Sequence, residues 1–202
     1  MLQNLALTGR LCGALLYHPP GAPEFETVKP LFMSAAWVRA WPYGTDDELS
    51  LLAERFAQHA HEPLNDAYQR LFIGPDALAA PPWGSVYLDR DGVVFGDSTL
   101  ALRHWLAARG ITSYHPPQEP EDHIGLLLLM AAWLAEERPA DVDAFLAGHL
   151  LPWAPRYLTL LEPAAGHPFY QAAASLTRLT LAGWHKAREI EVLAKRCIAD
   201  EC

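Results

Sequence analysis

Cysteine is scarce in this 202-residue chain, and long apolar runs are absent. The three cysteines, Cys12, Cys197 and Cys202, form no Cys-x-x-Cys pair and no zinc-binding spacing. Their odd number argues against a disulfide framework and suits a reducing compartment. The longest stretch without a strongly polar residue, residues 124–135, is too short to cross a bilayer, and the N-terminus lacks the basic region that opens a signal peptide. We therefore expect a cytoplasmic protein without membrane insertion.

Clusters of basic residues are missing too. Lys and Arg number 15 against 24 Asp and Glu, which gives a formal net charge of −9, and the cations are scattered. Because binding to a phosphate backbone needs clustered cations, we expect no nucleic-acid partner. An acidic surface favours cationic partners, although many cytoplasmic proteins are simply acidic. About half of the residues are apolar, 51%, so a substantial core needs no disulfide or metal.

The common catalytic motifs are absent as well, including the phosphate loop, Gly-x-Gly-x-x-Gly, Gly-x-Ser-x-Gly and His-Glu-x-x-His. Two fragments still leave an enzyme as the alternative. Ser98, in Gly96-Asp97-Ser98-Thr99-Leu100, resembles the nucleophile of GDSL-type hydrolases, but no Asp-x-x-His occurs, and an N-cap is the favoured interpretation. A metal-dependent enzyme would use His115, Glu119, Asp122 and His123, whose spacing matches no zinc pattern. The favoured interpretation places these carboxylates in the first turn of a helix, where the dipole stabilises them.

The pattern of apolar residues and breakers predicts an all-α fold. We expect a single-domain helical bundle over residues 1–202, with a hinge near residues 111–118. A capping box, Thr45 with Glu48, begins one helix, and Gly74 ends another. The expected helices cover residues 5–17, 28–41, a segment from 45, 63–74, 98–110, a segment from 119 that Pro139 ends, 142–151, 153–161, and a segment from 168 that runs to the C-terminus.

Residues 74–97 have Gly or Pro every few positions and predict a long loop or a short hairpin. In the hairpin, Val86–Leu88 and Val93–Phe95 flank Asp91-Gly92, a dipeptide typical of tight turns. Long loops in compact chains often carry function. Pro81 and Pro82 stiffen the backbone before Trp83, which indicates either an apolar anchor for a partner or a plug in the protein's own core.

Six fragments stand in the order and spacing of one known family. They are Tyr68–Pro75, Pro81–Asp89, Val94–Arg103, Glu119–His123, Leu127–Glu136 and His167–Tyr170. Together they resemble the TorD/DmsD family of redox-enzyme maturation chaperones, and Pro-Pro-Trp-Gly-Ser at residues 81–85 points to its DmsD branch. The block Glu119-Pro-Glu-Asp-His123 is the most specific family mark. One departure is Asp76, where close relatives have a Trp after Gly-Pro.

The resemblance implies an all-helical chaperone, not an enzyme, that needs no cofactor of its own. Its partner would be the twin-arginine leader of a molybdoenzyme, of the dimethyl sulfoxide reductase type in this branch, held for cofactor loading before Tat export. Components of the Tat translocase, met transiently at the inner face of the membrane, would be further partners. A nucleotide-responsive switch is the third class, which the missing phosphate loop does not support. The leader-binding positions that the resemblance implies are Tyr68, Leu71, Phe72, Pro82, Trp83, Asp122 and His123, with Glu119 as a weaker candidate.

A twin-arginine leader combines two guanidinium groups with an apolar stretch. We expect Leu71, Phe72, Pro82 and Trp83 to receive apolar side chains, and Asp122 and Glu119 to face the arginines. Since burial of a Leu- or Phe-sized side chain contributes about 1.5–3 kcal/mol and an exposed ion pair only about 0.2–1 kcal/mol, the apolar anchors should dominate the affinity.

Overall fold

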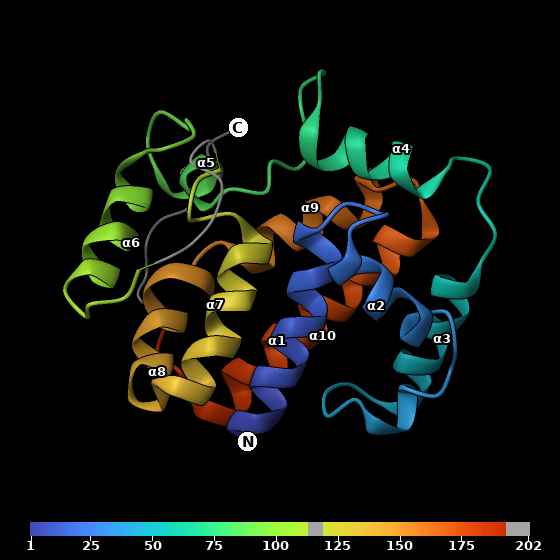
Figure 1. The fold of residues 1–202 in the computed structure, drawn as a ribbon, viewed down its shortest axis with the longest axis horizontal. Coiled ribbons are helices and arrows are strands. Elements are labelled where there is room, and N and C mark those ends of the chain that lie inside the picture. The colour runs from blue at the N-terminus through green and yellow to red at the C-terminus, as the bar shows by residue number, and fades with distance from the viewer. Residues whose placement is uncertain (113–118, 193–202) are drawn as a thin grey trace.

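The computed structural model describes residues 1–112 and 119–192, and the regular elements within these ranges are helices (Figure 1). The predicted all-α fold is confirmed. The α-helices are α1 (Leu2–Tyr17), α2 (Pro23–Phe32), α3 (Asp46–Ala57), α4 (Leu64–Tyr68), α5 (Gly84–Leu88), α6 (Asp97–Ala107), α7 (Ile124–Glu137), α8 (Val142–Phe145), α9 (Ala154–Ala164) and α10 (Pro168–Arg188). Short 3-10 turns cover Val38–Ala40 and Pro139–Asp141, and π turns extend α4 over Gln69–Ile73 and α8 over Leu146–Leu150.

Helices α1 and α7 lie side by side and run antiparallel (Figure 1). Their backbones approach closely because glycines face the contact. A Cβ on Gly9 would stand 2.9 Å from the carbonyl oxygen of Leu128, and a Cβ on Gly125 would stand 2.6 Å from Tyr17 Cβ. No larger residue fits such gaps without moving the backbone. This packing places Tyr17, the last residue of α1, beside the first turn of α7.

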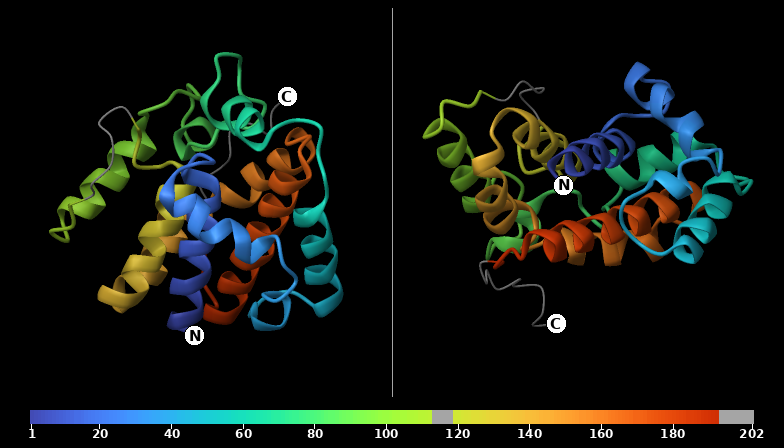
Figure 2. Two further views of the ribbon diagram at one scale, coloured as in Figure 1. Left: turned by 45° about the vertical axis from the view of Figure 1, so that its right-hand side comes forward. Right: turned by 90° about the horizontal axis from the view of Figure 1, so that it is seen from below.

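Helix α10 packs against α9, α3 and α1, and the left view of Figure 2 shows α1 between α7 and α10. Hydrogen bonds from buried indoles tie α10 to the N-terminal segments. Trp184 Nε1 donates to Thr8 Oγ1 at 3.2 Å, and Trp41 Nε1 donates to Thr180 Oγ1 at 3.2 Å. Because a buried indole N–H needs an acceptor, these pairs fix the register between both ends of the chain.

The second helix differs from the predicted range of residues 28–41. α2 begins at Pro23, where a helix does not need the missing N–H, and Glu24 and Glu26 in its first turn suit the helix dipole. Pro30 therefore lies inside the helix and not in its first turn. The segment contains two prolines that each suit a helix start, and the structure uses the earlier one.

The last helix begins after His167 as predicted, but it does not run to the C-terminus. α10 ends at Arg188, and Glu189 takes up a left-handed conformation with φ of 51°. His185, Lys186 and Arg188 in the last turn place positive charge at the negative end of the helix dipole.

Residues 74–97 are a loop that contains the short helix α5, and the hairpin alternative is wrong. Val86–Leu88, which the hairpin would need as a strand, are helical because the carboxylate of Asp122 accepts a hydrogen bond from Ser85 N in the first turn of α5. A side chain far along the sequence thus decides the local structure here.

Helix α6 begins at Asp97, so Ser98 is not its N-cap. The carboxylate of Asp89 caps the helix from the preceding loop and accepts hydrogen bonds from Ser98 N at 3.0 Å and from Ser98 Oγ at 2.9 Å. Gly96 leaves the space for this carboxylate, since a Cβ at that position would collide with it.

The hinge predicted near residues 111–118 falls largely on residues 113–118, which lie outside the described residues. Across residues 1–112 and 119–192, helices long and apolar enough for a membrane span are not found.

Candidate functional site

Two sequence motifs meet in a small backbone bridge. Residues 82–84 pair with residues 122–124 through an isolated antiparallel bridge centred on Trp83 and His123. Its two N–H···O bonds measure 3.1 and 2.8 Å. The bridge brings the stiff Pro-Pro-Trp segment onto the start of α7, so the two motifs that resemble the chaperone family most closely form one structural unit.

The carboxylate of Glu119 lies among aromatic side chains from separate segments. It accepts a hydrogen bond from Trp83 Nε1 at 2.7 Å. Burial raises the pKa of the Tyr68 hydroxyl, and the negative charge of Glu119 raises it further. The same two causes raise the pKa of Tyr17. We call Tyr17, Tyr68, Trp83 and Glu119 the aromatic–carboxylate cluster. An anion beside aromatic faces complements a guanidinium group.

Tyr68, Leu71 and Phe72 are buried and support this cluster from inside the protein. The Tyr68 hydroxyl donates to the carbonyl oxygen of Tyr17 at 2.5 Å, and its ring lies 4.9 Å from the ring of Phe72. Leu71 and Phe72 are 4% and 3% exposed, and Pro82 is also buried. These side chains hold the site in place and offer a ligand little surface.

Asp122 points into the protein. Its side chain is 4% exposed, and its Oδ2 atom accepts from Ser85 N at 2.6 Å. Burial raises the pKa of the Asp122 carboxyl, and the hydrogen bond from the Ser85 backbone partly offsets this rise. An ion pair with a leader arginine needs an accessible carboxylate, which Glu119 provides better. In this arrangement Asp122 positions the Trp83 segment through α5.

His123 is the N-cap of α7, and its Nδ1 atom accepts from Gly125 N at 3.1 Å. Burial lowers the pKa of His123 to about 3, so the ring is neutral. Its ring centroid lies 5.3 Å from that of Tyr17 and 6.2 Å from that of Trp83. Since α7 begins only at Ile124, the carboxylates of residues 119–122 precede the helix, and the prediction that they occupy its first turn is wrong.

Tyr17 is a member of the cluster that sequence reasoning missed. Its ring contacts His123, and its backbone accepts the hydrogen bond from Tyr68. The available signal was its place at the end of a helix before Pro19 and Pro20. That signal marks a helix boundary and not a site.

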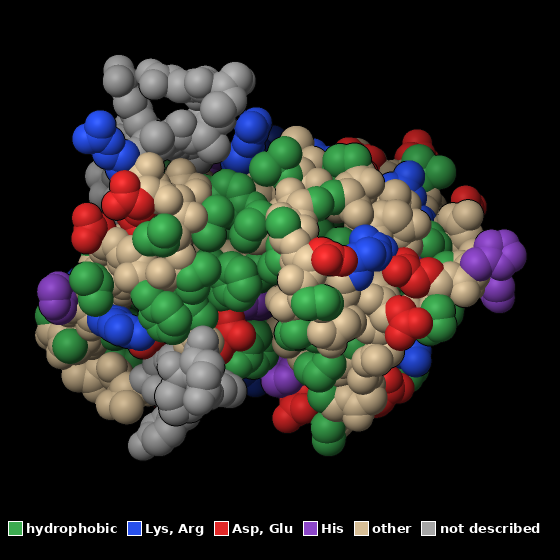
Figure 3. All heavy atoms as spheres, turned by 90° about the horizontal axis from the view of Figure 1, so that it is seen from above, with side chains coloured by type: hydrophobic (Ala, Val, Ile, Leu, Met, Phe, Trp, Pro, Cys, Tyr) green, Lys and Arg blue, Asp and Glu red, His purple; other side chains and the backbone are tan. Residues whose placement is uncertain are grey.

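Figure 3 shows one face of the molecule, on which hydrophobic side chains gather into a patch, and both acidic and basic side chains stand around this patch.

The groups needed by the two enzyme alternatives are engaged elsewhere. Ser98 is 9% exposed and donates its hydroxyl to Asp89, with no imidazole between them to act as base. For the metal-dependent alternative, residues 1–112 and 119–192 contain no group of three or more His, Cys, Asp or Glu side chains placed to hold a metal ion. His115 lies outside the described residues.

Comparison with known proteins defines the class first. A solved structure of a redox enzyme maturation protein from Archaeoglobus fulgidus matches with a TM-score of 0.53, covering 88% of this chain and 93% of its own, at 19% identity. This match shows that the chain shares the helical fold of that protein. Residues 39–159 also match the family model described as the nitrate reductase delta subunit.

Relatives define the family more narrowly. A Salmonella typhi protein described as the Tat proofreading chaperone DmsD is 48% identical over 96% of this chain and 95% of its own. A Haemophilus influenzae protein described in the same terms is 40% identical over 95% of each chain. The chain belongs to the TorD/DmsD family of redox-enzyme maturation chaperones, in its DmsD branch. The members of this family are chaperones and not enzymes, so the prediction of a chaperone is confirmed over the hydrolase and the metal-dependent enzyme.

Proposed function

We propose that this chaperone binds the twin-arginine leader of a molybdoenzyme of the dimethyl sulfoxide reductase type and holds it for cofactor loading before Tat export. The observation that carries the proposal is the Glu119 carboxylate, bonded to the indole of Trp83 and close to two tyrosines. The descriptions of the relatives as Tat proofreading chaperones support it. The proposed site comprises Tyr17, Tyr68, Leu71, Phe72, Pro82, Trp83, Glu119, Asp122 and His123.

We assign different roles to these residues. Trp83 is the anchor, because it is partly exposed and its neighbours are fixed by the backbone bridge. Glu119 selects the cationic side chain, and Asp122 and His123 hold the segment that carries Trp83. Burial of a large apolar side chain contributes about 1.5–3 kcal/mol, whereas ordering a disordered leader costs about 2–5 kcal/mol. Several apolar contacts are therefore needed for affinity, and the carboxylate contributes mainly to selection.

Arginine fits this cluster better than lysine. A guanidinium is planar, stacks on an aromatic face and donates two parallel hydrogen bonds to one carboxylate, whereas an ammonium is a point charge. In the cluster, the carboxylate of Glu119 lies at the edge of the Trp83 indole, so stacking and pairing are available together.

Isothermal titration with a synthetic leader from a dimethyl sulfoxide reductase, beside a twin-lysine control, tests the proposal. We expect saturable binding that favours arginine, and Glu119→Gln should remove most of this preference while binding persists. Absence of binding to several such leaders would contradict the proposal. Equal affinity for the arginine and lysine peptides would refute the role of Glu119.

The proposal also covers the location of the protein in the cell and its further partners. We infer that the chain acts as one domain in the cytoplasm and meets components of the Tat translocase at the inner face of the membrane when the client is released. Crosslinking of the leader-bound chaperone to isolated inner membranes, with and without the translocase, checks this step, and equal crosslinking in both samples would contradict it.

A further inference from the structure

Helix α7 has a second apolar face that is only partly covered: Leu126, Leu129 and Met130 are half-buried, and Trp133 is exposed. Its inner residues are buried, yet Leu126, Leu129, Met130 and Trp133 recur at helical spacing on the other side. Trp133 is 38% exposed. A helix that is apolar all round is normally buried on every side, and a contiguous exposed apolar stripe typically marks an interaction site.

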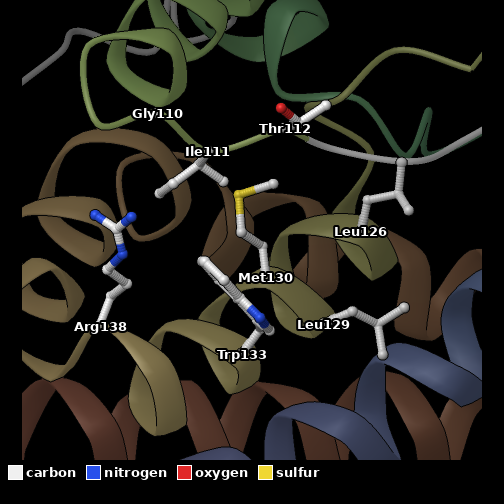
Figure 4. Close-up of a pocket in the computed structure, with 8 residues that line it drawn as sticks. All are labelled: Gly110, Ile111, Thr112, Leu126, Leu129, Met130, Trp133 and Arg138. Atoms are coloured by element: carbon white, nitrogen blue, oxygen red, sulfur yellow. The ribbon is translucent and has the colours of Figure 1, made fainter.

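This stripe forms one side of a groove of about 360 Å³, which is within the range of ligand-binding sites. The other side is the stretch 110–112 that follows α6. Figure 4 shows Ile111 of that stretch facing Met130 and Trp133 across the groove, with Arg138 at one end. The described lining combines the apolar side chains of Ile111 and the α7 stripe with the polar side chains of Thr112 and Arg138.

Helix α7 connects the groove to residues that contact the aromatic–carboxylate cluster. His123, which contacts both Tyr17 and Trp83, is the N-cap of α7, and Leu126 follows within one helical turn. From Leu126 to Trp133 the stripe extends for about 10 Å, or two helical turns, at the helical rise of 1.5 Å per residue. A chain that leaves the cluster along α7 therefore meets apolar side chains at once.

We propose that the groove receives the apolar stretch of the leader, while the cluster holds an arginine. The inference rests on the proposed function and adds a second docking surface, lined by Leu126, Leu129, Met130 and Trp133. Two arguments favour the leader as the occupant over a second copy of this chain. The first turn of α7 leads from His123, which contacts two members of the cluster, to Leu126 in the groove, and two copies that each carry a net charge of −9 repel one another. The apolar stretch of a leader adds no negative charge.

Two peptides and two variants test this inference. One peptide is the full leader, and the other ends directly after the twin-arginine motif. Trp133→Glu places a charge in the groove, and the control Leu51→Glu places one at a residue of α3 that is 65% exposed. We expect Trp133→Glu to weaken binding of the full leader by about tenfold or more, since a carboxylate is costly to bury, and to leave the short peptide unaffected. The control should change neither.

The outcomes separate the two proposals. If the wild type binds neither peptide, the proposed function fails and the inference fails with it. If the wild type binds both and Trp133→Glu binds the full leader equally well, only the inference is overturned. It is also overturned if sedimentation shows a wild-type dimer that Trp133→Glu dissociates without loss of leader binding. Should Trp133→Glu fail to fold, judged by its circular dichroism, Leu126→Glu replaces it with the same expected result, since Leu126 also lines the groove.

Discussion

Replacing Trp83 with alanine should weaken leader binding far more than replacing Asp122 with asparagine. Trp83 is partly exposed, and its indole N–H orients the Glu119 carboxylate at 2.7 Å. Trp83→Ala removes an apolar contact that contributes about 1.5–3 kcal/mol, which corresponds to roughly a 10- to 150-fold increase in Kd. It also removes the indole N–H that orients the Glu119 carboxylate, so the preference for arginine over lysine should fall as well.

Asp122→Asn acts on a buried group instead. Asparagine keeps the shape and an oxygen that accepts from Ser85 N, and burial already disfavours the charged carboxyl, whose pKa is raised. We expect a loss of about 1 kcal/mol in the free energy of unfolding and a change in leader affinity within about threefold.

Isothermal titration of both variants with one leader, combined with thermal unfolding, measures the two effects separately. The reasoning is refuted if Asp122→Asn melts like the wild type and yet loses as much affinity as Trp83→Ala. That result would mean that the carboxylate of Asp122 contacts the leader directly.

Three further predictions concern single residues. Burial lowers the pKa of His123 to about 3, so the ring does not change its charge between about pH 5.5 and 8. His123 should therefore cause no change in leader affinity over this range, which isothermal titration at several pH values checks. In the unfolded chain the imidazole of His123 has its ordinary pKa near 6.5 and binds a proton more readily than in the folded protein, so the free energy of unfolding should decline as the pH falls below about 6.5. Thermal melts of His123→Gln should show a smaller decline over the same pH range. A decline equal to that of the wild type would contradict this prediction. Asp89→Ala should lower the free energy of unfolding, measured in urea, by about 1–2 kcal/mol, because α6 loses its cap. Ser98→Ala should lower it by less, because the hydrogen bond from the Ser98 backbone N–H to Asp89 remains. Gly125→Ala should cost about 1–3 kcal/mol, since its Cβ meets Tyr17; wild-type stability in urea would refute the tight contact.

Local signals in the sequence predicted several elements correctly. The capping box is present, with Thr45 N donating to Glu48 Oε2 at 2.8 Å, and Gly74 ends the π turn with φ of 103°. Pro139 follows the end of α7, and α10 opens directly after His167. Each of these features depends on residues that are neighbours in the sequence, so pattern and propensity suffice to find them.

Three of the wrong predictions share a different cause, whereas the start of the second helix was misplaced because two nearby prolines both suit a helix start. Asp89, and not Ser98, caps α6, and residues 84–88 are helical because Asp122 accepts a hydrogen bond from their first turn. The start of α7 moved to Ile124, where the backbone pairs with the Pro-Pro-Trp segment. In each case a group from elsewhere in the chain decides the local structure, and a pattern within one window carries no information about it.

The site residues came from the family resemblance and not from geometry. The resemblance could not say which carboxylate faces outward, and it ranked Glu119 below Asp122. The structure bonds Glu119 to Trp83 and buries Asp122 beneath α5. It also adds Tyr17, whose place beside His123 follows from the close packing of α1 on α7.

The scattered origin of the aromatic–carboxylate cluster has a consequence for synthesis. Its members come from residue 17, residue 68, residue 83 and residue 119, and the bridge that fixes Trp83 needs residues 122–124. Helix α10, which packs against α1, is made later still. A nascent chain that ends before Glu119 therefore holds no complete cluster. Under the proposed function, the leader site is therefore complete only after residue 124 has been made, about three fifths of the way along the chain, and its supporting helix α10 follows still later.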